Sequence, residues 1–291
     1  MASFEQGKIL IDTGPSPRGF HRIEAYLRCP QLFAWGYGSG GDGPEAKARH
    51  DRLFPPDGKL VRGAIGHVGL AHVYAGAQAI QEGEDPRAYH DPLTAMQLVA
   101  EQFGELGEEQ LPVASRAVQG YVAHYQGEGI KILGVEQLEK TEFHGWPYTA
   151  RVDLEYEDRT GKVWYVDHKF VAKIDKRTQS RYSLSGQVLG LGWIGARKWK
   201  ERFAGVLLNF VGCVRPGFLR AIPDPAPFMF QRYPEVVAEA GEGIRYLEGA
   251  RESGQKMPVL ASTSEFTCQT PYGPCPALRF CQWGPPAGEE P

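Results

Sequence analysis

The chain's most constraining feature is a pair of β-rich runs, residues 148–157 and 162–171, separated by the turn sequence DRTG. Each run carries an aspartate among apolar residues, Asp153 in ARVDL and Asp167 in VWYVDHKF. Burying a carboxylate costs free energy unless it is paired with a cation or bound to a metal. The sequence therefore predicts a β-hairpin with a polar site built into it.

The length of the turn decides where the two aspartates lie. If the loop comprises residues 159–161, counting back along both strands places Asp153 directly opposite Asp167, with Cβ atoms about 5 Å apart. A two-residue loop would instead place Asp153 opposite Val166 and turn Asp167 to the other face. Lys169 shares the face of Asp167, because side chains alternate along a strand. A shared polar site thus requires the three-residue loop.

Two carboxylates and a lysine on one face suit metal-dependent hydrolysis of phosphodiesters. Carboxylate oxygens hold Mg²⁺ or Mn²⁺, and such an ion polarises a phosphate and acidifies water. Lys169 can then orient the attacking water or stabilise the charge that develops on the phosphate. The alternative is a structural ion pair, in which Lys169 neutralises one of the two strand carboxylates.

The hydrophobic pattern divides the chain into three parts. Residues 1–129 form a mostly helical N-terminal region, and residues 130–215 form an α/β core with a mixed sheet. Residues 216–291 contain a late helix, 227–252, and a tail rich in proline, glycine and cysteine. The tail has too few aliphatic residues to pack alone, so we expect it to need a stabilising link besides hydrophobic packing.

Two helical stretches of the N-terminal region contain a proline. Residues 19–37 have apolar residues at three- and four-residue spacing, and Pro30 interrupts this pattern directly after Cys29. Residues 92–126 predict a further helical region, which we expect to be broken near Pro112.

Composition and charge limit the class of protein. No apolar run approaches the ~18 residues of a membrane span, and MASFEQGKIL has neither the basic start nor the apolar stretch of a signal peptide. We therefore expect a cytoplasmic protein. The formal net charge of −3 argues against a histone-like coat for nucleic acid. However, residues 151–220 contain 14 lysines and arginines against 7 acidic residues, which indicates either a surface for a polyanion or a solvated face.

The chain has five cysteines, and disulfides are not expected in a cytoplasmic protein. Cys213 lies in the apolar run VLLNFVGCV, so we expect a small buried residue. Four thiolates can hold either a [4Fe–4S] cluster or Zn²⁺, and the residue types leave both open. The four candidates lie near the ends of the chain: Cys29, Cys268, Cys275 and Cys281.

Several motifs occur together in one order along residues 20–283. They are Gly63-Ala-Ile-Gly-His67, Asp153, Asp167-His168-Lys169 and Gln187. This combination resembles the PD-(D/E)XK nucleases of the RecB and AddB type. The segments FHRIEAYLRCPQLFAWGY and CPALRFC are similar to those that open and close the iron–sulfur members of that family, which include CRISPR-associated adaptation nucleases. The resemblance implies a restriction-endonuclease-like α/β fold: a mixed sheet flanked by helices, with a helical N-terminal region and a C-terminal iron–sulfur tail.

The resemblance also implies a metal site. Mg²⁺ or Mn²⁺ would be bound by His67, Asp153, Asp167 and the backbone carbonyl of His168. An imidazole beside carboxylates favours Mn²⁺ somewhat, because nitrogen ligands suit transition metals better. Glu136, on the first predicted strand, is a weaker supporting candidate.

Beyond the metal ligands, the resemblance implies that Lys169 is the catalytic lysine and that Gln187 positions substrate or Lys169. The family often has a tyrosine four residues after the glutamine, where this chain has Leu191. A [4Fe–4S] cluster is implied on the four terminal cysteines. Six residues separate Cys268 from Cys275, whereas two are usual in the family.

The implied substrate is DNA, cut by an exonuclease that acts on single strands or ends in recombination, repair or CRISPR adaptation. The implied partners are helicase, recombination or CRISPR-adaptation subunits. A rival hypothesis is a non-catalytic DNA-binding or scaffold subunit with an architectural metal cluster. In either case the basic segment that follows Lys169 would contact phosphates through Lys173, Lys176, Arg177 and Arg181.

Overall fold

A computed structural model describes most of the chain, which divides into two compact units. Among the described residues, the first unit comprises Asp57–Lys140 and Ala150–Phe230. The second comprises Thr141–Thr149 with the described parts of Pro15–Pro56 and Gln231–Pro291. No helix in the described ranges is both long and apolar enough to cross a bilayer. These ranges are 18–37, 55–89, 91–183, 185–253, 268–270, 273–275, 277 and 281.

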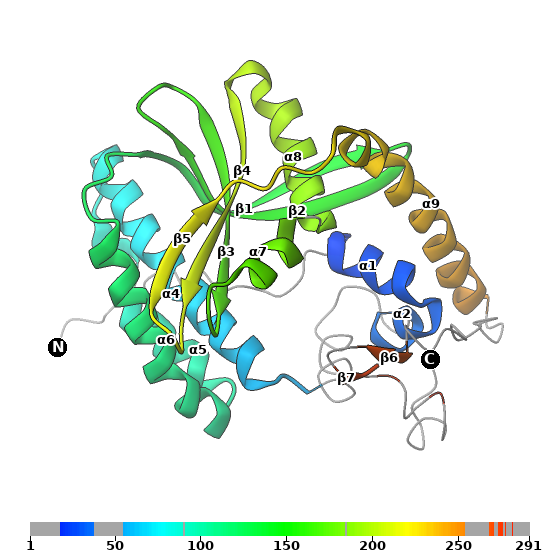
Figure 1. The fold of residues 1–291 in the computed structure, drawn as a ribbon, viewed down its shortest axis with the longest axis horizontal. Helices are drawn as coiled ribbons and strands as arrows, with labels where there is room; N and C mark the ends of the chain where they lie inside the picture. The colour runs from blue at the N-terminus through cyan, green and yellow to red at the C-terminus, as the bar shows by residue number, and fades with distance from the viewer. Residues whose placement is uncertain are drawn as a thin grey trace. The chain divides into compact units, whose positions relative to one another are not determined.

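Among the residues described, the chain forms a mixed sheet of five strands (Figure 1), which belongs to the first unit except where β1 and β2 run into residues 141–149. Strands β2 and β3 are antiparallel, β3 and β4 are parallel, and β4 and β5 are antiparallel. The predicted α/β class with a mixed sheet is confirmed, but the sheet continues past residue 215, where the predicted core ends. In spatial order the strands are β1 (Lys131–Phe143), β2 (Trp146–Glu157), β3 (Val163–Val171), β4 (Phe203–Gly212) and β5 (Gly217–Ala221).

The β2–β3 hairpin has the predicted three-residue loop. The backbone N–H of Asp158 donates to the carbonyl of Lys162 at 2.8 Å, as this loop requires. Counting back from that pair places Asp153 opposite Asp167, in agreement with the register of the strand residues between them. The predicted register is therefore confirmed.

Helices cover both faces of this sheet. On one face, α4, α5 and α6 share a hydrophobic core with strand residues that include Leu154 and Val166. On the other face, Lys198 of α8 reaches Glu155, which points the opposite way from its neighbour Leu154. The helices of this unit are α4 (Gly58–Glu82), η1 (Pro86–Ala88), α5 (Pro92–Glu101), α6 (Glu105–His124), α7 (Lys176–Ser183), α8 (Gly186–Trp199) and η2 (Lys200–Arg202).

A close approach of α4 to β3 fixes the position of His67. Asp57 begins α4 by accepting two backbone N–H groups of the first turn, at 3.0 and 2.9 Å. One turn before the middle of the helix, Gly66 faces the ring of Phe170 on β3. A Cβ atom at this position would lie 2.3 Å from that ring, so only glycine permits the contact. His67, the next residue, is thereby held against the sheet.

The predicted break near Pro112 is wrong, because α6 continues through this residue. Proline removes one backbone hydrogen bond, and the surrounding packing tolerates that loss here. The chain instead turns between α5 and α6 at Gly104, whose φ of +57° lies in the left-handed region that favours glycine.

In the second unit, two short helices meet at Cys29. The extended backbone of this residue, with φ −168° and ψ 118°, separates the two helices where Pro30 predicts an interruption. Arg22 on the first helix binds Glu248 on the long late helix at 2.7 Å. Most of the predicted tail lies outside the described residues. The elements are α1 (Phe20–Arg28), α2 (Pro30–Gly36), most of α9 (Pro227–Glu252), β6 (Gln269–Thr270) and β7 (Gly273–Pro274).

Candidate active site

Three side chains able to bind a metal converge in the first unit: His67 from α4, Glu136 from β1 and Asp153 from β2. The Nδ1 atom of His67 lies 3.3 Å from Oδ2 of Asp153. One ligand atom from each of the three residues lies within 4.8 Å of the other two. We call these three residues the ligand group. An imidazole and two carboxylates are donors that Mg²⁺ and Mn²⁺ accept, so these residues fit a divalent metal.

Glu136 occupies an unusual backbone conformation. Its φ of 51° lies in the left-handed region, which residues other than glycine rarely adopt. Such a conformation costs on the order of 1 kcal/mol or more, and it is found preferentially at functional sites. Sequence reasoning treats Glu136 only as a weaker candidate, because no local pattern in KILGVEQLEK signals a distorted strand.

Lys169 is held beside the ligand group by a network of hydrogen bonds. Its Nζ atom donates to Oδ1 of Asp167 and to Oε1 of Gln187, both at 2.9 Å. Gln187 in turn donates to Oδ1 of Asp167 at 3.0 Å. The ring of Tyr182, on α7, lies 5.2 Å from the Lys169 Nζ. We call Lys169, Asp167 and Gln187 the lysine network, and its geometry fixes the direction of the ammonium group.

Two opposing influences act on the pKa of Lys169. Burial by itself would lower the pKa, since it disfavours the charged form. The charge and the hydrogen bond of Asp167, with a further contribution from Asp153, outweigh burial and raise the pKa above its ordinary value. The metal-free protein therefore keeps Lys169 as a cation.

The predicted metal ligands coincide only in part with the ligand group. His67 and Asp153 belong to both, and the backbone N–H of His168 donates to Oδ2 of Asp153 at 2.7 Å. Among the described residues, Asp167 is outside the set whose ligand atoms lie within 4.8 Å of one another. Its carboxylate contacts Lys169 instead, at 2.8 Å from Oδ2. Metal binding by Asp167 and by the His168 carbonyl stays a prediction.

The ring of His168 lies on the opposite face of β3 from Lys169. It is 2% exposed, stacks on Tyr74 with ring centroids 5.9 Å apart, and places Nδ1 at 2.5 Å from the side-chain nitrogen of Asn209. Burial, followed by the influence of His67, lowers the pKa of His168 well below its ordinary value. The sequence analysis does not select Asn209. A single polar residue in the apolar run VLLNFVG nevertheless indicates a buried side chain that needs a hydrogen-bond partner.

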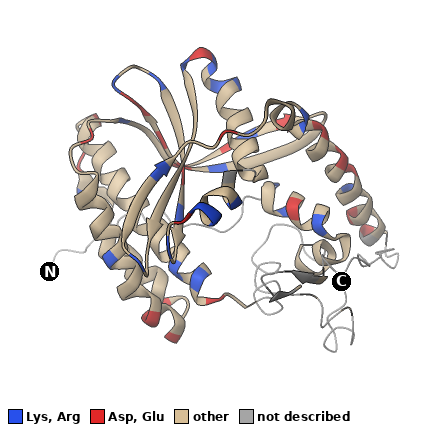
Figure 2. Cartoon of the chain, viewed as in Figure 1, with Lys and Arg blue, Asp and Glu red and all other residues tan. Residues whose placement is uncertain are grey.

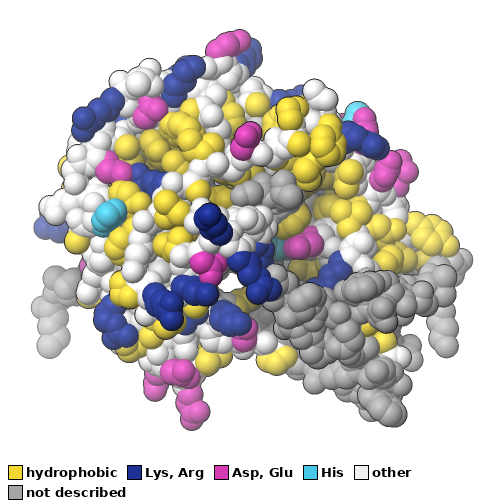
Figure 3. Space-filling view, in the orientation of Figure 1, with side chains coloured by type: hydrophobic (Ala, Val, Ile, Leu, Met, Phe, Trp, Pro, Cys, Tyr) yellow, Lys and Arg dark blue, Asp and Glu magenta, His cyan; other side chains and the backbone are white. Residues whose placement is uncertain are grey.

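The four cations predicted to contact phosphates lie on α7 or just before it. Figure 2 shows lysine and arginine along α7, and Figure 3 shows such side chains gathered near the middle of the same view. Lys176, Arg177 and Arg181 belong to the helix, whereas Lys173 precedes it and pairs with Asp175 at 2.8 Å. Their contact with DNA stays a prediction.

Comparison with known proteins places the chain in a family. A family model of the PD-(D/E)XK nuclease superfamily matches residues 20–282. The chain belongs to this superfamily. A solved protein described as "Crystal structure of SSO0001" is similar to the chain at 9% sequence identity and a TM-score of 0.31, over 59% of this chain and 73% of that one. A search of curated proteins gave no match.

The match confirms the predicted superfamily as a whole. It makes the chain a relative of metal-dependent nucleases, and the mixed sheet with flanking helices agrees with that assignment. The narrower resemblance to the RecB and AddB type, and to the iron–sulfur members, stays a prediction.

Within the second unit, a hairpin accounts for the long spacing between Cys268 and Cys275. The strands β6 and β7 lie between these cysteines and pair antiparallel, and continuing their register places Cys268 opposite Cys275. The backbone N–H of Cys275 donates to the carbonyl of Cys268 at 2.7 Å. Six intervening residues therefore still bring the two cysteines side by side.

The other two predicted cluster cysteines lie near this pair. Cys275 packs against Trp35 of α2, the helix that begins directly after Cys29. Burial raises the pKa of the Cys281 thiol, and the nearby thiols of Cys29, Cys275 and Cys268 raise it further. All four cysteines belong to the second unit, and this agrees with the prediction that their thiolates share one centre.

Proposed function

We propose that the protein is a metal-dependent deoxyribonuclease, an exonuclease that acts on single strands or at duplex ends. The observation that carries this proposal is the ligand group beside the buried lysine network, in a chain of the PD-(D/E)XK superfamily. A structural ion pair would account for Asp167 and Lys169, but it does not account for an imidazole and two carboxylates that converge next to them.

His67, Glu136 and Asp153 would hold the metal, with Asp167 and the His168 carbonyl as further ligands of the predicted set. When bound, Mg²⁺ or Mn²⁺ supplies a positive charge that polarises the scissile phosphate and acidifies water. The imidazole favours Mn²⁺ of the two.

Lys169 contributes a fixed positive charge next to the reacting phosphate. Hydrolysis adds a water oxygen to phosphorus and breaks the bond to the leaving sugar oxygen, so negative charge grows on the phosphate oxygens. Asp167 and Gln187 hold the Lys169 ammonium before the reaction begins, which avoids the cost of orienting it later. A substitution that frees this ammonium should therefore slow the chemical step.

The basic residues of α7 would hold the DNA backbone. These residues are Lys176, Arg177, Arg181 and the preceding Lys173. They come directly after β3, which carries Lys169, so DNA that reaches the site would pass them. Contacts of this kind are independent of sequence and weaken as salt increases. The protein is accordingly proposed to cut without sequence preference.

The test is cleavage of end-labelled single-stranded and duplex DNA in Mg²⁺ and in Mn²⁺. The wild type should cut only with metal, and Lys169→Met and Asp153→Asn should each reduce the rate by about 100-fold or more. Lys131→Met, an exposed lysine at the start of β1, is the matched control and should cut normally.

Each result of this assay has a definite meaning. Products that shorten from one end establish an exonuclease and its polarity. Full metal-dependent cleavage by Lys169→Met and Asp153→Asn in clean preparations would refute the proposed site. DNA binding without any cleavage by the wild type would favour the scaffold subunit instead.

For the second unit we propose a [4Fe–4S] cluster on Cys29, Cys268, Cys275 and Cys281, with Zn²⁺ as the alternative. Protein purified without oxygen should be brown, with broad absorption near ~400 nm. Colourless protein that contains zinc would overturn the cluster. The expected setting is cytoplasmic, with helicase, recombination or CRISPR-adaptation subunits as partners, and capture of the tagged protein from its native host would identify them.

A further inference from the structure

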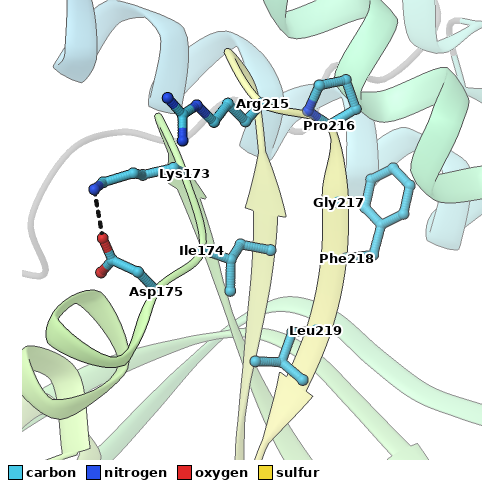
Figure 4. A pocket seen from close by; sticks show the side chains of 8 residues that line it. All are labelled: Lys173, Ile174, Asp175, Arg215, Pro216, Gly217, Phe218 and Leu219. Atoms are coloured by element: carbon cyan, nitrogen blue, oxygen red, sulfur yellow. Dashed lines mark ion pairs between the residues drawn. The ribbon is translucent and has the colours of Figure 1, made fainter.

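A cavity of about 360 Å³ opens on the first unit just beyond the end of β3 (Figure 4). Its walls come from two segments: residues 173–175, which follow β3, and the turn and strand of the β4–β5 hairpin. Sites for small molecules typically measure roughly 300–1,000 Å³. The cavity is therefore large enough for part of a substrate, and the ligand group and the lysine network contribute no wall to it.

Strand register places one wall residue of this cavity, Leu219, on the same face of the sheet as Lys169. Lys169 pairs with Phe210 on β4, and Phe210 pairs with Leu219 on β5, which lines the cavity. Residues paired across neighbouring strands point to one face, and two strand spacings amount to about 10 Å. The ring of Tyr182 lies between, 5.8 Å from Phe210 and 5.2 Å from the Lys169 Nζ. A continuous row of side chains thus leads from Lys169 to the cavity.

The lining combines apolar walls with a net positive charge, because it contains Lys173 and Arg215 against the single acidic residue Asp175. Ile174 and Leu219 supply aliphatic surface to the cavity (Figure 4). Lys173 pairs with Asp175 at 2.8 Å. The guanidinium of Arg215 contacts no acidic side chain of the described residues, so it is available for an anion.

We propose that this cavity is a subsite for one unpaired nucleotide of the strand being cut. Arg215 contacts a backbone phosphate a short distance from the scissile one, and Ile174 and Leu219 contact the face of the base. A base in a duplex stacks on its neighbours and cannot offer that face, whereas every unpaired base can. The subsite rests on the proposed nuclease function and refines it, because it selects single-stranded DNA.

The first test measures DNA binding without metal, so it does not depend on cleavage. A fluorescent single-stranded oligonucleotide is titrated in EDTA at several salt concentrations with wild type, Arg215→Gln and Arg116→Gln. Arg116 is exposed on α6, over the opposite face of the sheet, and is the matched control for charge.

We expect Arg215→Gln to bind roughly tenfold more weakly, with the salt slope reduced by about 0.7, the value for one phosphate contact on a single strand. Arg116→Gln should bind as the wild type does. If the two variants bind alike, the subsite is refuted. An equal loss on a blunt duplex for Arg215→Gln would refute its preference for an unpaired nucleotide.

The second test locates the subsite during cleavage. A single methylphosphonate linkage removes one negative charge at a known place in the DNA. The wild type should pause twice, once at the neutral linkage and once at a fixed distance from it, and Arg215→Gln should lose only the second pause. A single pause in both proteins would refute the subsite while leaving the nuclease function intact. Absence of all cutting by the wild type would instead refute the nuclease function, and the binding assay would still decide on the subsite.

Discussion

Replacing Gly66 with alanine should destabilise the first unit and disturb the metal site at the same time. Gly66 precedes His67 on α4, and a Cβ at this position would lie 2.3 Å from the Phe170 ring. Gly63 lies three residues earlier on the same helix, and a Cβ there would meet nothing within 4 Å. Gly63→Ala is therefore a matched control, since it makes the same chemical change without the clash.

The magnitude follows from two contributions. Glycine to alanine inside a helix is worth about 1 kcal/mol of added stability, and both variants gain this amount. Gly66→Ala alone also overpacks the α4–β3 contact, which typically costs about 1–3 kcal/mol. The helix contribution cancels in the comparison, so Gly66→Ala should be less stable than Gly63→Ala by about 1–3 kcal/mol.

Urea unfolding followed by tryptophan fluorescence measures this difference. Gly63→Ala should shift the midpoint upward from the wild type, and Gly66→Ala should unfold at a clearly lower urea concentration than Gly63→Ala. Added Mn²⁺ should stabilise Gly66→Ala less than the wild type, because displacing α4 moves His67 from the ligand group. Equal midpoints for the two variants would show that α4 does not depend on this close approach, and the reasoning would fail.

Three further predictions follow from single contacts. Asp57→Ala removes the side chain that begins α4, and it should lower the free energy of unfolding by about 1 kcal/mol in the same urea assay; an unchanged midpoint would contradict the capping role. Asp153→Asn should abolish the rise in melting temperature that Mn²⁺ gives the wild type, measured by calorimetry, and a preserved rise would exclude Asp153 as a ligand. Cys275→Ala should lose the iron content and the visible absorption of the anaerobic protein, whereas Cys213→Ala should keep both; equal iron in the two variants would refute the cluster assignment.

Local features of the fold follow directly from the sequence. The interruption at Cys29 and Pro30 is confirmed, because proline lacks the N–H that a continuing helix needs. The opposition of Asp153 and Asp167 is confirmed as well, since the loop length fixes the register of a hairpin by counting. Pro112 shows the limit of such rules, because packing can override the preference of a single residue.

The site needs more than local pattern. His67 and Asp153 are far apart in sequence, and they meet only because Gly66 lets α4 approach β3. The entry of Glu136 into the ligand group accompanies a left-handed backbone that no neighbouring residue predicts.

By itself, the sequence determined which residue types were available, the hairpin register, the interruption at Pro30 and the extent of the late helix, because these depend on neighbours along the chain. The tertiary structure alone decided which of those residues converge. It brought Glu136 into the ligand group beside His67 and Asp153, and it opened the cavity beside Arg215. The physical reason is that such contacts join segments distant in sequence, and their geometry is set by how whole helices and strands pack.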